Sequence, residues 1–186
     1  MILLDNRFEN EKSNAWDSDI LGADQWLWLD LALKRGKARG VQATLIGAGV
    51  QMIVDRPFAP PIEGFYEYNK HRLFDALRNN KMENVLLLSG DIHLGQIYEA
   101  ECSGFTGQTV LPEVTSSGLS HVQSDLLPHP VHTFRTLTLQ DQEASPIFMA
   151  KNYGLIAVGG EGEVLAQVSV RGEDGKEGLR KDYTRE

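Results

Sequence analysis

The segment with the clearest chemical potential in this sequence is Gly90-Asp91-Ile92-His93-Leu94-Gly95. One residue separates Asp91 from His93, and in an extended backbone such side chains project to the same side. A carboxylate and an imidazole held side by side suit a hard or borderline metal ion or a catalytic role. Asp-x-His alone is a weak motif, so a second interpretation stays open, in which Asp91 caps a turn and His93 is a hydrogen-bonded core residue.

Two other polar clusters follow short apolar segments. Asp5 and Arg7 come directly after residues 2–4, and Gly47-Ala48-Gly49 comes directly after residues 43–46. Arg7 could hold a phosphate or a carboxylate through a bidentate contact, or it could simply pair with Asp5. The glycine cluster lacks the lysine and the downstream glycine of known phosphate-binding loops, which disfavours a nucleotide site.

A serine nucleophile is a weaker alternative. Ser116 and Ser117 are close in sequence to His121, but no nucleophile-elbow motif surrounds the two serines. The single cysteine, Cys102, excludes an intramolecular disulfide and a cysteine-rich zinc site. We interpret Cys102 as a packed thiol without a chemical role.

The elements that must position the polar clusters follow a strand–helix–strand pattern. Helical spacing of apolar residues predicts a helix over residues 24–37, with Asp24 as its N-cap, and a second helix over residues 69–80. Such helices supply the crossovers that parallel strands require. Sites in open α/β sheets form outside the carboxyl ends of the strands, so we expect the three clusters to converge. The apolar segments that predict these strands are residues 2–4, 43–46 and 84–88.

The rest of the chain has the alternating pattern of further strands. We expect strands over residues 96–101 and 109–113, and an antiparallel pair over residues 153–158 and 163–170. The loop between the last two is rich in glycine, as hairpin loops often are. Residues from 171 onward are charged, and we expect them to fray.

Length and charge limit the classes of function. With 186 residues, of which 41% are hydrophobic, the chain is large enough for one core and we expect a single domain. Eighteen basic against 26 acidic residues give a net charge of −8 without a basic stripe, which disfavours nucleic-acid and anionic-membrane partners. The sequence contains no apolar run of the roughly 20 residues that a transmembrane helix needs, and no secretory signal pattern.

Six motifs carry a likeness to a known family. They are Leu4-Asp5-Asn6-Arg7, Leu21-Gly22-Ala23-Asp24-Gln25-Trp26-Leu27-Trp28-Leu29, Gly47-Ala48-Gly49-Val50-Gln51, Leu87-Leu88-Ser89-Gly90-Asp91-Ile92-His93, Glu113-Val114-Thr115-Ser116-Ser117-Gly118-Leu119 and Asn152-Tyr153-Gly154-Leu155-Ile156. In this order they resemble the C-terminal half of PhoD-like alkaline phosphatases, a branch of the calcineurin-like metallophosphoesterases. The resemblance implies an α/β fold, part of a four-layer αββα sandwich with mixed sheets and antiparallel C-terminal strands. Residues 1–170 would form the C-terminal half of that domain, and residues 171–186 a tail.

The resemblance also implies an activity, the hydrolysis of phosphate monoesters or diesters by a metal-activated water. In-line attack on phosphorus would proceed while cations offset the charge that grows on the phosphoryl oxygens. By this resemblance Asp91 and His93 belong to the metal centre, with calcium and iron as the expected metals. Arg7 would act with them in catalysis, and Arg7 and Gln51 would contact the substrate. The candidate helpers are Asp5, Glu63 and His121.

The sequence departs from the family pattern in its metal motifs. The family's first metal motifs precede the segment equivalent to residues 4–7, and this chain has no counterpart of them, although a two-metal site needs on the order of six or more protein ligands. The sequence therefore predicts a truncated phosphoesterase whose missing N-terminal half would carry any export signal. The alternative is a non-catalytic remnant that associates with itself or with a missing half, because a sheet without its first strands exposes an edge. A third interpretation is a mononuclear metal-binding module without hydrolysis.

Overall fold

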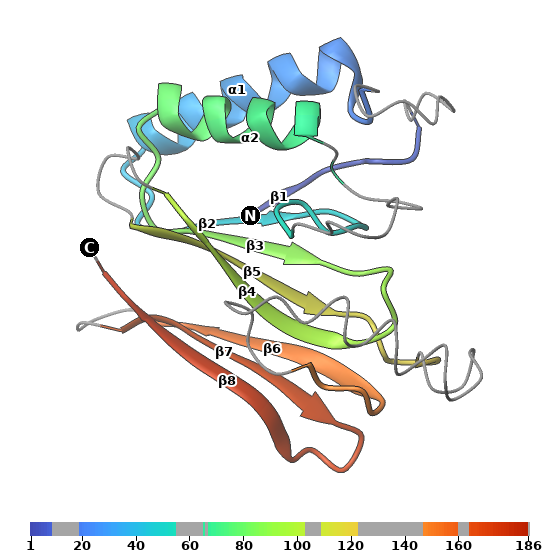
Figure 1. Cartoon of the computed structure of the whole chain (residues 1–186). Helices are drawn as coiled ribbons and strands as arrows, with labels where there is room; N and C mark the ends of the chain where they lie inside the picture. The colour runs from blue at the N-terminus through green and yellow to red at the C-terminus, as the bar shows by residue number, and fades with distance from the viewer. Residues whose placement is uncertain are drawn as a thin grey trace.

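The computed structural model describes residues 1–8, 19–54, 65, 67–102, 109–122, 147–159 and 164–185. These residues form three layers (Figure 1). Two helices cover one face of a five-stranded sheet, and a three-stranded sheet packs against the other face. The α/β class and the two packed sheets are as predicted, and the described residues account for one of the two helical layers of a four-layer sandwich.

The larger sheet is mixed. Its first four strands are parallel and its last strand is antiparallel to its neighbour. The smaller sheet is antiparallel throughout. The larger sheet has the order β1 (Ile2–Leu3), β2 (Thr44–Gly47), β3 (Val85–Ser89), β5 (Val110–Ser116) and β4 (Gly95–Glu101), and the smaller sheet has the order β6 (Asn152–Val158), β7 (Val164–Gly172) and β8 (Glu177–Thr184).

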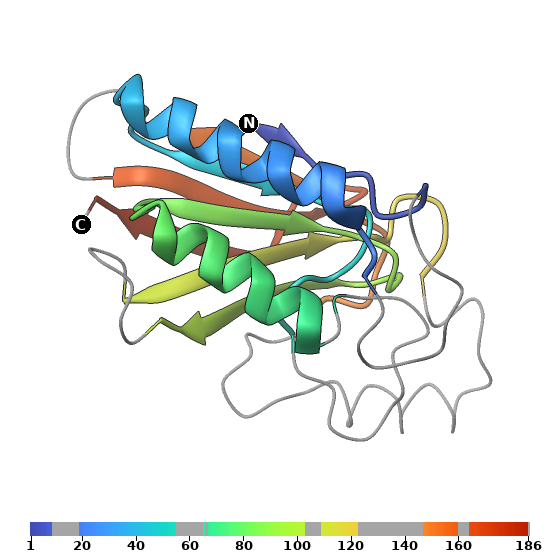
Figure 2. The ribbon, with the colours of Figure 1, turned by 90° about the horizontal axis from the view of Figure 1, so that it is seen from above.

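The two helices connect the parallel strands, as the pattern predicts. Helix α1 (Gly22–Ala38) joins β1 to β2, and helix α2 (Glu67–Asn79) lies between β2 and β3. Seen from the helical side, α1 lies over the β1 side of the sheet and α2 over the side of β5 and β4 (Figure 2). Among the described residues, neither helix is long and apolar enough to cross a membrane.

The start of α1 differs from the prediction that Asp24 is its N-cap. Leu21 occupies the cap position without a side-chain bond, and Asp24 lies in the first turn. The carboxylate of Asp19 instead accepts hydrogen bonds from the amides of Leu21 and Gly22, each at 3.0 Å, and from Trp26 Nε1 at 2.8 Å. The carboxylate of Asp19, which precedes the helix, thus accepts hydrogen bonds from free amides that the side chain of the cap residue usually binds.

Both helices end in the same type of reverse turn. A residue with positive φ follows each helix: Gly40 (φ 67°) after α1 and Lys81 (φ 49°) after α2. In α2 the amide of Met82 donates to the carbonyl of Leu77 at 3.0 Å, and the corresponding bond in α1 measures 3.2 Å. This is the Schellman arrangement, and the buried side chains of Met82 and Leu77 supply the apolar contact that often accompanies it.

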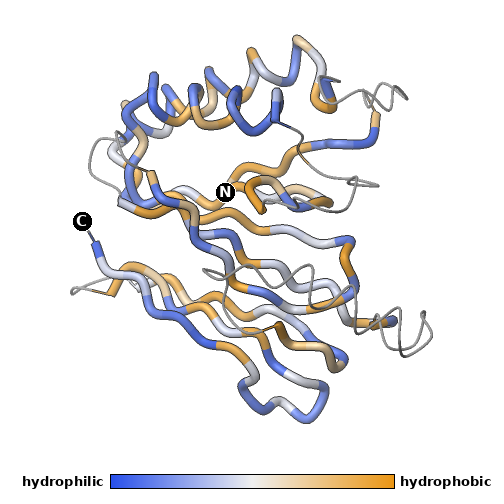
Figure 3. The backbone as a smooth tube through the Cα atoms, in the orientation of Figure 1, coloured by the Kyte–Doolittle hydropathy of each residue, from blue (hydrophilic) through white to orange (hydrophobic). Residues whose placement is uncertain are grey.

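Two hydrophobic cores hold the layers together. The larger core lies between the helices and the five-stranded sheet and includes Trp26 and Leu87. The smaller core lies between the two sheets and includes Val114 and Val168. Hydrophobic positions run along the central strands, whereas the helices alternate between hydrophobic and hydrophilic positions (Figure 3). The central strands are therefore covered on both faces, which explains their nearly continuous apolar sequence.

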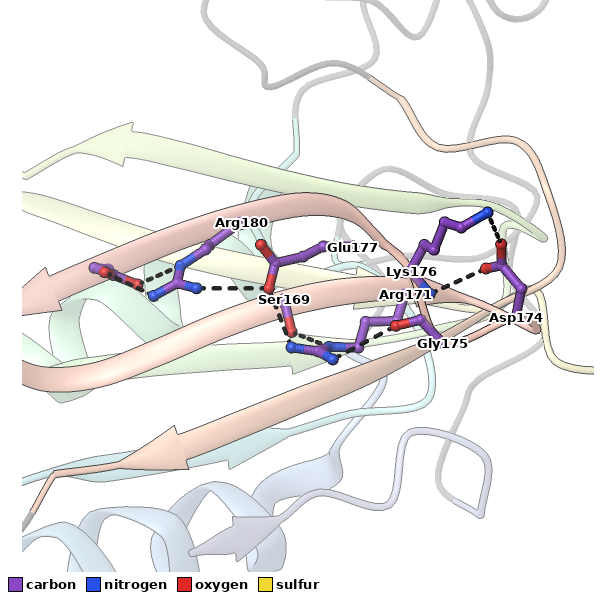
Figure 4. A network of polar contacts seen from close by, with 8 residues as sticks. Ser169, Arg171, Asp174, Gly175, Lys176, Glu177 and Arg180 are labelled. Carbon is purple, nitrogen blue, oxygen red and sulfur yellow. Dashed lines mark hydrogen bonds and ion pairs between the residues drawn. The ribbon is translucent and has the colours of Figure 1, made fainter.

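The expectation that residues from 171 onward fray is wrong. Strand β7 continues to Gly172, and β8 pairs with it along its length. Leu179 of β8 is buried in the core between the sheets, while charged neighbours form surface ion pairs, including Arg171 with Glu177 at 3.1 Å (Figure 4). Leu179 and the exposed Arg180 lie on opposite faces because successive side chains of a strand point to opposite faces.

Candidate functional site

The three polar clusters meet at the carboxyl edge of the larger sheet, as predicted. The amide of Gly49 donates to Asn6 Oδ1 at 2.9 Å. A Cβ atom added at Gly90 would lie 3.4 Å from the carbonyl oxygen of Gly49. Arg7 Nη2 lies 3.7 Å from Asp91 Oδ1. The segments that follow β1, β2 and β3 are therefore in direct contact.

The turn that carries Asp91 and His93 is not extended. The φ angles of these residues are 74° and 57°, so the period-two argument for their side chains does not apply. Asp and His tolerate this left-handed region better than most residues. Ile92 and Leu94 anchor the turn, because both are buried and pack against Ile147 and Met149. Of the two residues that alternate with Ile92 and Leu94, Asp91 is exposed and His93 is half-buried.

The segment after β1 is fixed by Asp5. Its carboxylate accepts hydrogen bonds from the amides of Arg7 at 2.9 Å and Phe8 at 3.1 Å. These bonds to the charged form lower the pKa of Asp5. The backbone of Asp5 also makes two hydrogen bonds of 2.7 Å with the side-chain amide of Gln25 in α1. Asp5 therefore shapes the turn on which Arg7 stands.

The ion pair of Arg7 with Asp91 lies in solvent. The two side chains are 61% and 38% exposed. Exposed pairs contribute roughly 0–1 kcal/mol to stability. The contact therefore places the guanidinium of Arg7 beside the end of β3, with most of the side chain exposed to solvent.

Gln51 lies in a buried polar network instead of on the surface. Its Nε2 atom donates to Thr115 Oγ1 at 2.9 Å and to Gln96 Oε1 at 3.2 Å. Ser89 Oγ lies 2.8 Å from Thr115 Oγ1 and extends the network to β3. Contact between the Gln51 amide and a substrate would require that the amide leave these partners.

Glu113, a residue of β5 within one of the six motifs, binds the segment that follows β2. Its side chain is 0% exposed. The amide of Met52 donates to Oε1 at 2.7 Å, and the amide of Ile53 donates to Oε2 at 2.9 Å. A charged residue within an apolar strand is the signal that could have found it, because buried charges require bonded partners.

Among the described residues, His121 and Ser116 make no hydrogen bond or ion pair with Arg7, Asp91 or His93. His121 is exposed and its Nδ1 lies 3.1 Å from Ser120 Oγ. Ser116 Oγ donates to Asn152 Oδ1 at 3.0 Å. In the described part of the chain no hydrogen bond joins Ser116 or Ser117, the serine candidates, to His121. Glu63 lies outside the described residues.

The described residues do not form a metal site by themselves. No group of three or more His, Cys, Asp or Glu side chains among them is placed to hold a metal ion. Asp91 and His93 offer a carboxylate oxygen and an imidazole nitrogen, which suit calcium and transition metals respectively. Closed protein sites use about four ligands or more. These two residues alone therefore do not complete a metal centre.

Comparison with known proteins identifies the family. A family model described as PhoD-like phosphatase matches residues 3–168. A solved structure described as "Structure of PhoD" has a TM-score of 0.64 at 14% sequence identity, over 98% of this chain and 38% of that chain. The chain thus shares the fold and spans well under half the length of that protein. No curated protein sequence matches the chain. The chain belongs to the PhoD-like phosphatase family, as the six motifs predict.

Proposed function

We propose that this chain carries part of the centre of a metal-dependent phosphoesterase that hydrolyses phosphate monoesters or diesters. The observation that carries the proposal is the approach of Arg7 and Asp91, from the ends of β1 and β3, to 3.7 Å at the carboxyl edge. Sites in open α/β sheets form at such an edge. The guanidinium of an arginine suits the bidentate binding of a phosphoryl group, and the Arg7 side chain is 61% exposed.

The roles follow from the chemistry of each group. Arg7 binds the phosphoryl oxygens and offsets the negative charge that grows on them in the transition state. Asp91 and His93 contribute two ligands to the metal centre, for which calcium and iron are the expected ions. When bound, these ions supply positive charge that activates a water molecule. Asp5 acts through the backbone of Arg7, which its carboxylate holds.

We infer that residues beyond the described ones complete the centre. The support is the two-ligand donor set and the 38% of the solved PhoD chain that this chain spans. In this proposal the described residues, strand β8 included, form one part of the catalytic domain, and residues outside them bring the remaining ligands. Glu63 and His121 remain candidate helpers.

Binding of inorganic phosphate tests the role of Arg7. We expect Arg7→Gln to weaken phosphate binding at least tenfold in isothermal titration calorimetry. Arg39→Gln is the matched control, because it removes the same charge from an exposed residue after α1. We expect the control to change the affinity less than twofold. If both variants weaken phosphate binding equally, the change in net charge explains the effect, and a phosphate site at Arg7 is contradicted.

Turnover and metal content test the incomplete centre. The 186-residue chain is expected to show little hydrolysis of p-nitrophenyl phosphate esters with added calcium or iron. Robust metal-dependent hydrolysis by this chain would contradict the incomplete site. In a longer chain that contains the remaining ligands, His93→Ala is expected to lower the metal content. Unchanged metal stoichiometry would remove His93 from the ligand set.

An interaction module is the second candidate function. Strand β1 lies at the edge of the larger sheet. Beside it, Leu3 (66% exposed) and Trp28 line an apolar groove of about 630 Å³ together with Val41. Such an edge favours association with a polypeptide that supplies further strands. If association is the function, Leu3→Glu abolishes it in sedimentation velocity, whereas Arg7→Gln leaves it unchanged.

A further inference from the structure

We propose that Glu113 is a positioning residue of the carboxyl-edge site, where its buried carboxylate holds the segment after β2 and thereby fixes Gly49 between the segments of Arg7 and Asp91. The inference rests on the proposed function. It concerns how the site is held together and assigns no contact between Glu113 and substrate.

The clamp begins with two side chains on one face of β5. Glu113 and Thr115 are two residues apart, so they project to the same side of the sheet. In the register of the neighbouring strand they pair with Leu87 and Ser89 of β3. Leu87 belongs to the core on the helical side. The two polar side chains therefore extend from the helical face of the sheet, close to its carboxyl edge.

These side chains hold three consecutive residues. Glu113 accepts the amides of Met52 and Ile53, and Thr115 accepts the side-chain amide of Gln51. Both oxygens of Glu113 act as acceptors, which suits the ionised carboxylate because that form has no proton to donate. Hydrogen bonds to an ionised group are roughly twice as strong as neutral ones. Residues 51–53 are therefore fixed on β5.

The fixed segment reaches the site through Gly49. The amide of Gly49 holds the side chain of Asn6, the residue before Arg7. The carbonyl of Gly49 lies against Gly90, the residue before Asp91. Gly49 is thus the spacer between the two charged groups, and only one residue separates it from the clamped segment. A shift of residues 51–53 changes the separation of Arg7 and Asp91.

The residue type supports a positioning role over simple packing. Burial of a carboxylate is costly unless bonded partners compensate for the lost water. An apolar side chain of similar size would fill the same space without that cost. An apolar side chain could not bind two successive amides, so it would not define the path of the backbone at Met52 and Ile53. Glu113→Gln keeps the size but offers only one acceptor, so one of the two amides then faces an NH₂ group.

Amide hydrogen exchange of the full chain, measured by NMR, tests the clamp independently of any ligand. We expect Glu113→Gln to accelerate exchange at Met52 and Ile53, and also at Gly49, by at least tenfold. Thr115→Val is the second variant, and it serves if Glu113→Gln does not fold. Thr44→Val is the matched control, because it removes a buried hydroxyl at the other end of the sheet. We expect the control to leave Gly49 within twofold.

Binding of inorganic phosphate then links the clamp to the site. We expect Glu113→Gln to weaken phosphate binding about tenfold, and to add little further loss when Arg7→Gln is already present. Faster exchange at residues 52 and 53 with unchanged exchange at Gly49 overturns the positioning role. Additive losses in the double variant overturn it as well. If the unmodified chain binds no phosphate while Gly49 responds as expected, the proposed function fails and the clamp stands.

Discussion

The two ends of strand β3 adopt similar backbone conformations for different reasons. Two residues with positive φ lie near its amino end, Lys81 (49°) and Asn84 (56°). Two more follow its carboxyl end, Asp91 (74°) and His93 (57°). L-amino acids enter this region at a cost, so each occurrence needs a structural or functional cause.

At the amino end, the connection from α2 supplies a cause for the first of these conformations. Lys81 takes the left-handed position of the turn that ends α2, where glycine stands after α1. Asn80 reinforces this turn, because its side-chain amide donates to Asp30 Oδ1 at 2.7 Å and to the carbonyl of Ala76 at 2.8 Å. The side chain of Asn80 at this end of β3 therefore bonds to residues of both helices.

At the carboxyl end no helix terminates in the described structure. The turn after β3 buries Ile92 and Leu94 and directs Asp91 toward Arg7, a residue of the segment that follows β1. At the carboxyl end the two residues with positive φ are Asp91 and His93 themselves, and Asp91 points to the charged group of Arg7. The comparison teaches that a positive φ can serve chain connection alone, as at Lys81, so it indicates function only together with further observations at the same place.

The largest effect in this comparison is expected at Asn80. Asn80→Ala removes two hydrogen bonds from a buried side chain, so we expect the free energy of unfolding to fall by about 1–2 kcal/mol in urea titrations. Asn79→Ala is the control, since Asn79 is exposed and should change stability by less than about 0.5 kcal/mol. Phosphate binding should stay the same in both variants. Loss of phosphate binding in Asn80→Ala would show that the two ends are not independent.

Much of this fold could be predicted from the sequence because its signals are local. Apolar segments that end abruptly in polar residues mark the parallel strands, and the meeting of Arg7 with Asp91 follows from their shared edge. Strand β8 could not be predicted in this way, because charged residues outnumber apolar ones in it and Leu179 is its one buried side chain. A net count of charge does not report on which face of a strand the charges lie.

The site could be predicted only in part, because its supporting contacts are distant in sequence. Glu113 binds amides 60 and 61 residues away, and nothing near it in the sequence identifies those partners. The turn at Asp91 was expected to be extended, but anchoring by Ile92 and Leu94 bends it. Residue types indicate which groups have chemical potential, whereas tertiary contacts decide which of them are presented.

Glycine substitutions give the next largest effect and test the reason for each positive φ. Lys81→Gly and His93→Gly both relieve the steric cost of a Cβ atom, but each also gives the unfolded chain more freedom. We expect each variant to raise the free energy of unfolding by up to about 1 kcal/mol. In a longer chain that contains the remaining ligands, only His93→Gly should weaken the binding of added iron(II) in titrations. Equal metal binding by the two variants would mean that His93 is not a metal ligand and that the turn after β3 has a structural role only.

The smallest effect concerns two aspartates. Asp30 bonds to Asn80 near the amino end of β3, and Asp5 holds the segment of Arg7 near the carboxyl end. Hydrogen bonds from Lys34 and then Asn80 lower the pKa of Asp30, whereas the backbone amides of Arg7 and then Phe8 lower that of Asp5. A lowered folded-state pKa means that the ionised group stabilises the fold above its ordinary value of 3.8. That contribution disappears as the pH falls through the lowered pKa.

Acid unfolding at two salt concentrations distinguishes these two aspartates. Asp30→Asn and Asp5→Asn should each reduce the loss of stability as the pH falls below about 4. Salt screens charge pairs at the surface, so 0.5 M NaCl should diminish the Asp30 effect, which depends first on Lys34. The Asp5 effect depends on backbone amides at fixed distances and should respond less to salt. An equal response would mean that Asp5 acts on the Arg7 side chain through charge and does not fix its backbone.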